Sequence, residues 1–405
     1  MKRRATAQIL TGALVLTLFG PVLWWLAPQS DFAVHSAEAE YWATYGSTRI
    51  QLPNFLFAGL TVIFQMCIPG LGFLSAGVLV ALLAQGLLAA TLFECVLQSW
   101  PSGPTNAERL LLCALGAVSL MIVMPFNLLT FGQHNLYHGY IATSVYHSPS
   151  LALLKPLALL AWLQAIRIFE PGKAGLRSVA FAATVVGLGV LAKPNFAVAL
   201  LPALVSFAGW RTLRHRPGDS VDWRRVWLGF VAPGCAVLAW QYLYTYSSNQ
   251  AAHPSEMASG IVFAPLRIVS ALSQASPAGL TMRFLLSILF PAAVYLAYTP
   301  QARRDVALNL AWVLFSAGAA CSYLLAESGP RAADGNFLWS GQITLFILFA
   351  TSATFALRHA VADRSPRRAL CAFAYGLHLA SGLVWYALQF LHRFVPSVPL
   401  LKEWF

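Results

Sequence analysis

Charge is the scarcest property of this 405-residue sequence. Only 10% of its residues carry a charged side chain, while 58% are hydrophobic. A soluble domain averages about 25% charged residues, so the composition excludes an ordinary water-soluble globular protein. The alternating pattern of outer-membrane β-strands is absent as well, which leaves a helical membrane protein as the predicted class.

Motifs for nucleotide binding and for a serine nucleophile are also missing. The sequence contains neither G-x-x-x-x-G-K-[ST] nor G-x-G-x-x-G, which argues against an ATP-driven or nucleotide-binding enzyme. It also lacks G-x-S-x-G, although an acyl- or phosphotransferase that uses His147 or His35 stays open. None of the six cysteines forms a CxxC pair, so we expect no disulfide framework and no zinc site.

The sequence is rich in apolar runs of about 20 residues, the length that crosses a bilayer as a helix. They recur along the whole chain and predict one all-α, polytopic transmembrane domain over residues 1–405 with about 11 transmembrane helices. The predicted spans are 8–27, 72–97, 109–129, 151–167, 178–192, 194–210, 226–245, 281–299, 306–325, 338–357 and 369–391.

The basic residues predict the topology. The apolar stretch 54–98 is interrupted by Pro69-Gly70 and could cross the membrane once or twice. A single crossing places most of the 26 Lys and Arg residues on the side of the N-terminus, and the positive-inside rule therefore favours it. We expect a cytoplasmic N-terminus and a first outer loop, 28–71, with interfacial helices. The net charge of +12 thus sets orientation and predicts no nucleic acid partner.

The first outer loop begins with SDFAVHSAEAEYW (30–42). If this stretch is helical, Asp31, His35 and Glu38 lie on one stripe. A carboxylate one turn from an imidazole is suited to general-base catalysis. The alternative is that Asp31 only complements the dipole at a helix start. Both interpretations stay open at this point.

Two Lys-Pro pairs fall at the predicted outer surface. Lys155 and Lys193 each precede a proline that is expected to open an apolar span. An ammonium group at a helix N-terminus is unfavourable by itself, which suggests that a bound phosphate compensates it. The alternative is that both side chains extend toward lipid head groups.

Two further outer segments contain candidate binding residues. ESGPRAADGNFLWSG (327–341) supplies Arg331, a possible phosphate-binding fork, and Asn336. FGQHNLYHGYIATSVYHSPS (131–150) supplies His138 and His147, which we expect to hydrogen-bond or stack with a sugar. His134 and His138 could also ligate a metal, but two histidines without a third ligand do not indicate one. No cofactor is predicted, although a divalent metal stays possible.

The order of these features resembles the GT-C superfamily of polytopic glycosyltransferases. The resemblance rests on a first helix, an outer loop with an early acid and a surface helix, and many further spans. YHSPS…LLKP and GNFLW also resemble segments of bacterial polytopic proteins of polysaccharide pathways. The resemblance implies a polyprenyl-phosphate sugar donor and a catalytic base in the first outer loop, which Asp31 matches by position. Many members have a large soluble C-terminal domain that is not expected here, so acceptor recognition would occur within the membrane domain.

These observations together predict an inverting glycosyltransferase in the bacterial inner membrane that acts on the periplasmic face in cell-envelope polysaccharide or glycolipid assembly. The acceptor could be a glycan, lipid or protein. Asp31 would be the base, with His35 or Glu38 holding it in place. The predicted substrate-binding residues are Lys155, Lys193, Arg331, His138, His147 and Asn336. The alternative is a transporter or flippase for a lipid-linked or anionic substrate, although no internal repeat is visible.

Overall fold

The chain is almost entirely helical, as predicted. The computed structural model describes residues 2–46, 53–101, 106–133, 136–170, 175–214, 220–246, 260–360 and 365–391. Within these residues the only sheet is an antiparallel pair of three-residue strands, β1 (Ile261–Phe263) and β2 (Leu325–Glu327).

Eight helical segments in the described residues are long and apolar enough to cross a membrane, which supports a multi-pass membrane protein. They coincide with eight of the eleven predicted spans. Seven are the helices α1 (Lys2–Leu26), α4 (Phe73–Ser99), α6 (Pro149–Ile166), α8 (Asn195–Arg214), α14 (Val306–Leu324), α15 (Leu338–Ala360) and α16 (Pro366–Leu391). The eighth combines a π-helical segment, Arg225–Val231, with α9 (Ala232–Tyr246).

The other three predicted spans are not single long helices. Two of them correspond to α5 (Ala107–Ile122) and α7 (Leu176–Ala192), which have 16 and 17 residues. At about 1.5 Å per residue, each is somewhat shorter than the roughly 30 Å hydrocarbon core. The count of eleven crossings therefore stays a prediction.

The remaining predicted span, 281–299, is broken into α11 (Pro277–Ser287) and α12 (Leu289–Ala297), which are bent by 59°. Pro291 explains the break, because it has no N–H for the Ser287 carbonyl and its ring would clash with that carbonyl. If the bent pair is one span, the chain has up to nine candidate spans among the described residues.

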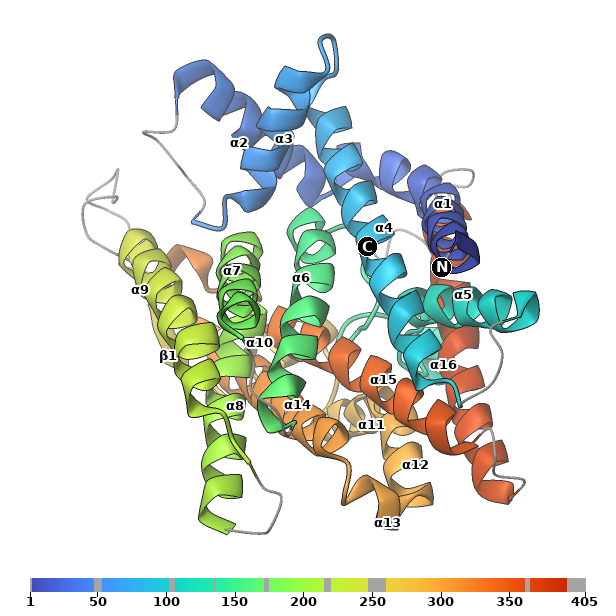
Figure 1. Cartoon of the computed structure of the whole chain (residues 1–405). Coiled ribbons are helices and arrows are strands. Elements are labelled where there is room, and N and C mark those ends of the chain that lie inside the picture. The colour runs from blue at the N-terminus through green and yellow to red at the C-terminus, as the bar shows by residue number, and fades with distance from the viewer. Residues whose placement is uncertain are drawn as a thin grey trace.

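The first outer loop forms two short helices, α2 (Asp31–Tyr45) and α3 (Leu56–Cys67), which pack on each other and on α4. They lie at one end of the molecule, beside the start of α4 (Figure 1). In the stretch 54–98 only α4 is long enough to cross, because the chain turns at Gly70, whose φ is 84°. This division agrees with one crossing and an interfacial α3, whereas the orientation of the protein in a membrane stays a prediction.

The most buried span is α15, which packs against α4, α6, α8, α12 and α14. Small residues permit this close packing: a Cβ atom at Gly318 of α14 would lie 2.1 Å from the Thr344 hydroxyl of α15. The short helix α10 (Arg267–Ser273) and the one-turn α13 (Thr299–Ala302) connect the spans around it. The start of α15 is consequently held in place by several helices, and the candidate site is at this end.

The side chain of His378 in α16 is fully buried, as is usual for an ionisable residue within an apolar span. Its Nε2 accepts a hydrogen bond from the Phe290 N–H (3.3 Å), next to the break between α11 and α12. Its Nδ1 must therefore be protonated and donate to the Met124 carbonyl at 2.6 Å. The histidine thus satisfies one backbone N–H near the break and one carbonyl in the segment that follows α5.

Replacing Gly382 of α16 with alanine should destabilise the fold. The new Cβ would lie 2.1 Å from the Ile122 carbonyl oxygen, so α5 and α16 must separate, at a cost of about 1–3 kcal/mol. Gly376→Ala, in the same helix with nothing within 4 Å of its Cβ, is the matched control. Thermal unfolding in detergent should show a lower Tm for Gly382→Ala only, and equal Tm values in the two variants would contradict this packing.

Candidate functional site

Residues 31–42 are helical, which is the condition under which Asp31, His35 and Glu38 share one stripe. Asp31 is the first residue of α2, and His35 and Glu38 follow on the same side, where both are buried. The His35 ring packs edge-on against Phe57 of α3 at 5.7 Å between centroids. The packing of α3 therefore fixes one side of the predicted catalytic stripe.

Asp31 interacts electrostatically with residues from two other segments. Burial lowers the pKa of Lys193 to about 8, while the negative charge of Asp31 acts in the opposite direction. Burial also lowers the pKa of His147, and here Asp31 again opposes the shift whereas Lys193 and His138 add to it. The acid from the first outer loop thus lies close enough to influence both a lysine and a histidine predicted to bind substrate.

His35 belongs to the same electrostatic cluster. Its pKa is lowered to about 4, first by burial and then by Lys193, with Asp31 opposing. The imidazole is therefore neutral near pH 7. A neutral ring one turn from Asp31 is suited to hydrogen bonding and positioning rather than to carrying positive charge.

Lys193 lies where the ends of four helices meet. It occupies the turn between α7 and α8, and its Nζ donates a hydrogen bond to the Ser150 hydroxyl of α6 at 3.2 Å. The same ammonium group lies 4.5 Å from the centre of the Trp339 ring of α15. These contacts partly offset the free-energy cost of burying the ammonium group. The part of this desolvation cost that they do not offset favours an anionic ligand beside Lys193.

Lys193, Arg331 and Asn336 line one cavity of about 290 Å³, which we call the polar cavity. Glu327 at the end of β2 is part of the same wall: its carboxylate lies 3.2 Å from Arg331 Nε and accepts a hydrogen bond from Asn336 Nδ2 at 2.5 Å. Asn195 Nδ2, at the start of α8, donates to the Asn336 carbonyl at 2.7 Å. Three predicted binding residues therefore converge from segments far apart in the sequence.

A second cavity of about 130 Å³, which we call the aromatic cavity, is lined by His138, His147, Tyr137, Trp339 and Gln342 among others. Gln342 donates to the Tyr137 hydroxyl at 3.0 Å, and the rings of Tyr137 and His147 lie 5.9 Å apart. Burial is the main reason that the Tyr137 pKa rises to about 12, so its hydroxyl stays protonated. Aromatic faces combined with an amide and neutral imidazoles suit a sugar ring.

Trp339 connects the two cavities. Trp339 lines the aromatic cavity, and its ring contacts the ammonium group of Lys193, which lines the polar cavity. The His147 ring lies 5.8 Å from the Trp339 ring at an angle of 60°. The contact between Trp339 and Lys193 therefore joins the walls of the two cavities at the start of α15.

Lys155 has different surroundings from Lys193. Its Nζ donates to the Thr143 carbonyl at 2.7 Å and lies 5.2 Å from the centre of the Phe346 ring. The prediction that its proline opens a helix is wrong: α6 begins earlier, at Pro149, and Pro156 lies inside it. Lys155 is absent from the described walls of both cavities, so its role in binding stays a prediction.

The predicted catalytic residues do not line either cavity. Asp31, His35 and Glu38 are all absent from the described walls, although His35 and Glu38 are buried. Arg331 already pairs with Glu327 and, at 3.4 Å, with Asp334. To bind a phosphate, the Arg331 guanidinium would have to exchange one of these carboxylates for the ligand.

Sequence reasoning missed several residues of this region. Glu327 begins the segment 327–341 but was not predicted to take part in binding. Gln342 lies in the predicted span 338–357 and was not predicted to line a cavity. Arg283 is buried and donates to the His138 carbonyl at 2.8 Å, and its charge adds to the lowering of the His138 pKa by burial. The sequence did indicate a buried position for Arg283, because a lone arginine within an apolar run usually faces protein or a polar cavity.

A metal site receives no support from the described residues, among which no group of three His, Cys, Asp or Glu side chains could hold an ion. His134, the proposed partner of His138, lies outside the described residues. Whether the protein uses a metal therefore stays open.

No protein-family model, curated protein or solved structure matches this chain. The function is consequently inferred from the chemistry of the two cavities.

Proposed function

We propose that the protein is an integral-membrane glycosyltransferase that moves a sugar from a polyprenyl-phosphate donor to an acceptor on the outer face. The observation that carries the proposal is Lys193, a buried cation on the wall of the polar cavity that is hydrogen-bonded to Ser150. The negative charge of Asp31 acts on this lysine, although Asp31 is absent from the described walls of both cavities. An acid and a buried cation from separate segments are the two groups that inverting transfer from a phosphate requires.

Asp31 acts as the base in the proposed reaction. The acceptor hydroxyl gives its proton to the Asp31 carboxylate as its oxygen attacks the anomeric carbon, and a new glycosidic C–O bond forms. The C–O bond to the phosphate breaks on the opposite side, which inverts the anomeric carbon. Lys193, with Arg331 after it exchanges a carboxylate partner, stabilises the negative charge that develops on the phosphate.

The cavities have complementary parts in this proposal. The polar cavity, with Lys193, Arg331 and Asn336, holds the phosphate. Its wall includes Leu238 and Tyr242 of α9, and because Tyr242 is 52% exposed, a prenyl tail can approach from that side. The aromatic cavity, with Tyr137 and the other ring residues named above, holds the sugar or the acceptor.

A transporter or flippase is the second candidate, because the bent pair α11–α12 resembles the discontinuous helices of transporters. The contacts at the break are internal, since Phe290 N–H bonds to His378. Proteoliposomes loaded with a lipid-linked sugar distinguish the candidates: movement of the intact substrate without cleavage favours the transporter.

Asp31→Asn should reduce sugar transfer by at least about 100-fold, because the amide cannot accept the acceptor's proton. Turnover is measured in proteoliposomes with a panel of polyprenyl-phosphate sugars, and the Tm of the variant establishes that it is folded. Glu40→Gln, an exposed substitution in the same helix, is the matched control and should retain wild-type turnover. Wild-type turnover by folded Asp31→Asn would remove Asp31 as the base, and no transfer by the wild-type protein from any donor would remove the proposal itself.

A further inference from the structure

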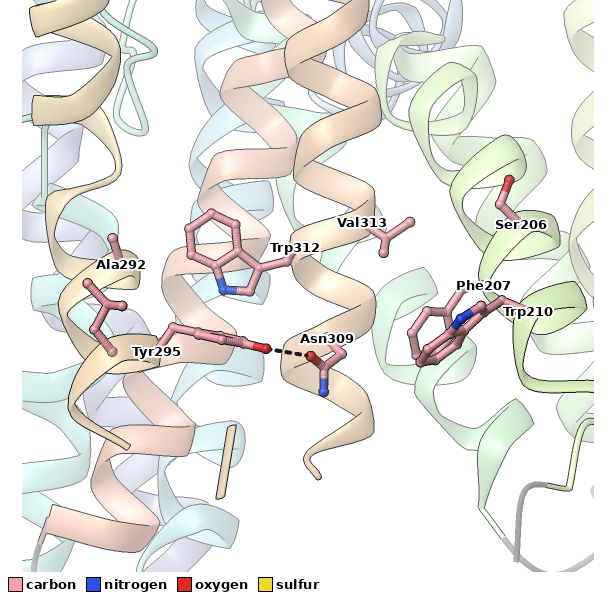
Figure 2. A pocket seen from close by; sticks show the side chains of 9 residues that line it. Ser206, Phe207, Trp210, Ala292, Tyr295, Asn309, Trp312 and Val313 are labelled. Carbon is pink, nitrogen blue, oxygen red and sulfur yellow. Dashed lines mark hydrogen bonds between the residues drawn. The ribbon is translucent and has the colours of Figure 1, made fainter. Parts of the chain in front are cut away.

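A groove of about 630 Å³ runs between α8, α12 and α14, away from the candidate site. Figure 2 shows Trp312 and Tyr295 on one side of Asn309, and Phe207 and Trp210 on the other. The lining is mainly apolar and aromatic. Its principal polar contact is internal, with the Tyr295 hydroxyl donating to Asn309 Oδ1 at 3.2 Å. We call it the α8–α14 groove.

The groove lies at the ends of the helices that are remote from the two cavities. Phe207 is roughly twelve residues beyond Asn195 along α8, which corresponds to about 18 Å. In α14, Asn309 and Trp312 are near the first residue, whereas Ser322, which borders the aromatic cavity, is near the last. The α8–α14 groove therefore lies toward the opposite ends of these candidate spans and is separate from the two cavities.

The walls of the groove suit hydrocarbon. Trp210 is 45% exposed and Leu296 is 74% exposed, although both lie on helices in or next to candidate spans. Tryptophan and tyrosine rings are common near membrane interfaces, where one part of the ring contacts acyl chains. A chain in this groove would cover these side chains.

Basic residues lie next to residues of the groove, either in space or in sequence. The Arg214 guanidinium, one turn beyond Trp210, lies 4.1 Å from the centre of that ring. Arg303 and Arg304 are exposed in the turn that joins α13 to α14, close in sequence to Tyr295 and Asn309. The neighbouring acid, Asp305, is already engaged by Arg358 at 3.0 Å. The positive charge at this end is therefore not offset by that carboxylate.

We propose that the α8–α14 groove binds an anionic phospholipid, with an acyl chain between α8 and α14 and the phosphate beside Arg214 and Arg303. The charge at the mouth selects an acidic lipid over a zwitterionic one. In the predicted topology this end faces the cytoplasm, where anionic lipids attract basic residues near the membrane surface. The proposal does not depend on glycosyltransferase activity.

Native mass spectrometry of the full-length protein, released from mixed phosphatidylglycerol and phosphatidylcholine, tests the proposal. The wild-type protein should retain phosphatidylglycerol at least five-fold over phosphatidylcholine. The double variant Arg214→Gln/Arg303→Gln should lose this preference, whereas Arg367→Gln, an exposed substitution at the start of α16, should keep it. Ser206→Trp, which fills the groove from an exposed position, should reduce retention of both lipids.

Equal retention of the two lipids by the wild-type protein would overturn the proposal. So would an unchanged preference in the double variant, because the selective site would then lie elsewhere. The double variant replaces exposed charged side chains and should fold. Its lipid preference therefore tests the proposal even if Ser206→Trp does not fold.

Discussion

Lys193→Met should lower sugar transfer by at least about 100-fold, whereas Lys155→Met should leave it close to the wild-type rate. Removing a preorganised charge from a developing anion typically costs 10²–10³ in turnover. Lys193 is on the wall of the polar cavity, whereas the Lys155 ammonium is bound to the Thr143 carbonyl. The two variants make the same substitution in the same Lys-Pro context and differ only in surroundings. Similar losses in both would mean that Lys155 also acts on the substrate.

The pH dependence of turnover tests the role of Lys193 independently. Because the Lys193 pKa is about 8, turnover should fall as the pH rises through that value and the ammonium loses its proton. Lys193→Arg keeps its charge throughout, so its residual turnover should show no such fall. A wild-type profile that is flat from pH 7 to 9.5 would contradict the role of Lys193 as a charged partner of the phosphate.

Acidification from pH 6.5 to pH 4 should cost about 3 kcal/mol of folding stability through His35 alone. The folded-state pKa of about 4 lies below the unfolded value of 6.5, so the unfolded chain binds more protons between these pH values. Stability is therefore complete above pH 6.5 and is lost as the pH falls toward 4. A fall in Tm over this range measures the effect.

His35→Gln removes the titrating ring and should flatten the dependence of Tm on pH between 6.5 and 4. The control is Phe57→Leu, which weakens the ring contact of His35 while the imidazole remains. Its Tm should be lower than the wild-type value at every pH, with the pH dependence retained. If His35→Gln keeps the wild-type dependence, other groups determine the acid sensitivity.

Much of the fold follows from local pattern. Apolar length alone identified eight helical segments that are candidate spans, and the expected interfacial helices of the first outer loop correspond to α2 and α3. The break between α11 and α12 was also present in the sequence as Pro291, since a proline inside an apolar span removes one hydrogen bond and displaces a carbonyl. It was overlooked because hydropathy does not distinguish a bent helix from a straight one.

The site depends more on contacts between distant segments. Lys155 and Lys193 have the same neighbour in sequence, but α6 begins at Pro149 and α8 begins directly after Pro194. One lysine is thereby placed inside a helix and the other in a turn beside a cavity. Similarly, Glu327 reaches Arg331 and Asn336 because β2 pairs with β1, and three-residue strands leave no clear sequence pattern.

The contact between Lys193 and Trp339 has a consequence for binding. A molecule that shifts this indole in the aromatic cavity also changes the surface that the Lys193 ammonium group contacts. Under the proposed function we therefore expect the affinities of the two cavities to be thermodynamically linked, so that each ligand alters the binding of the other by the same factor.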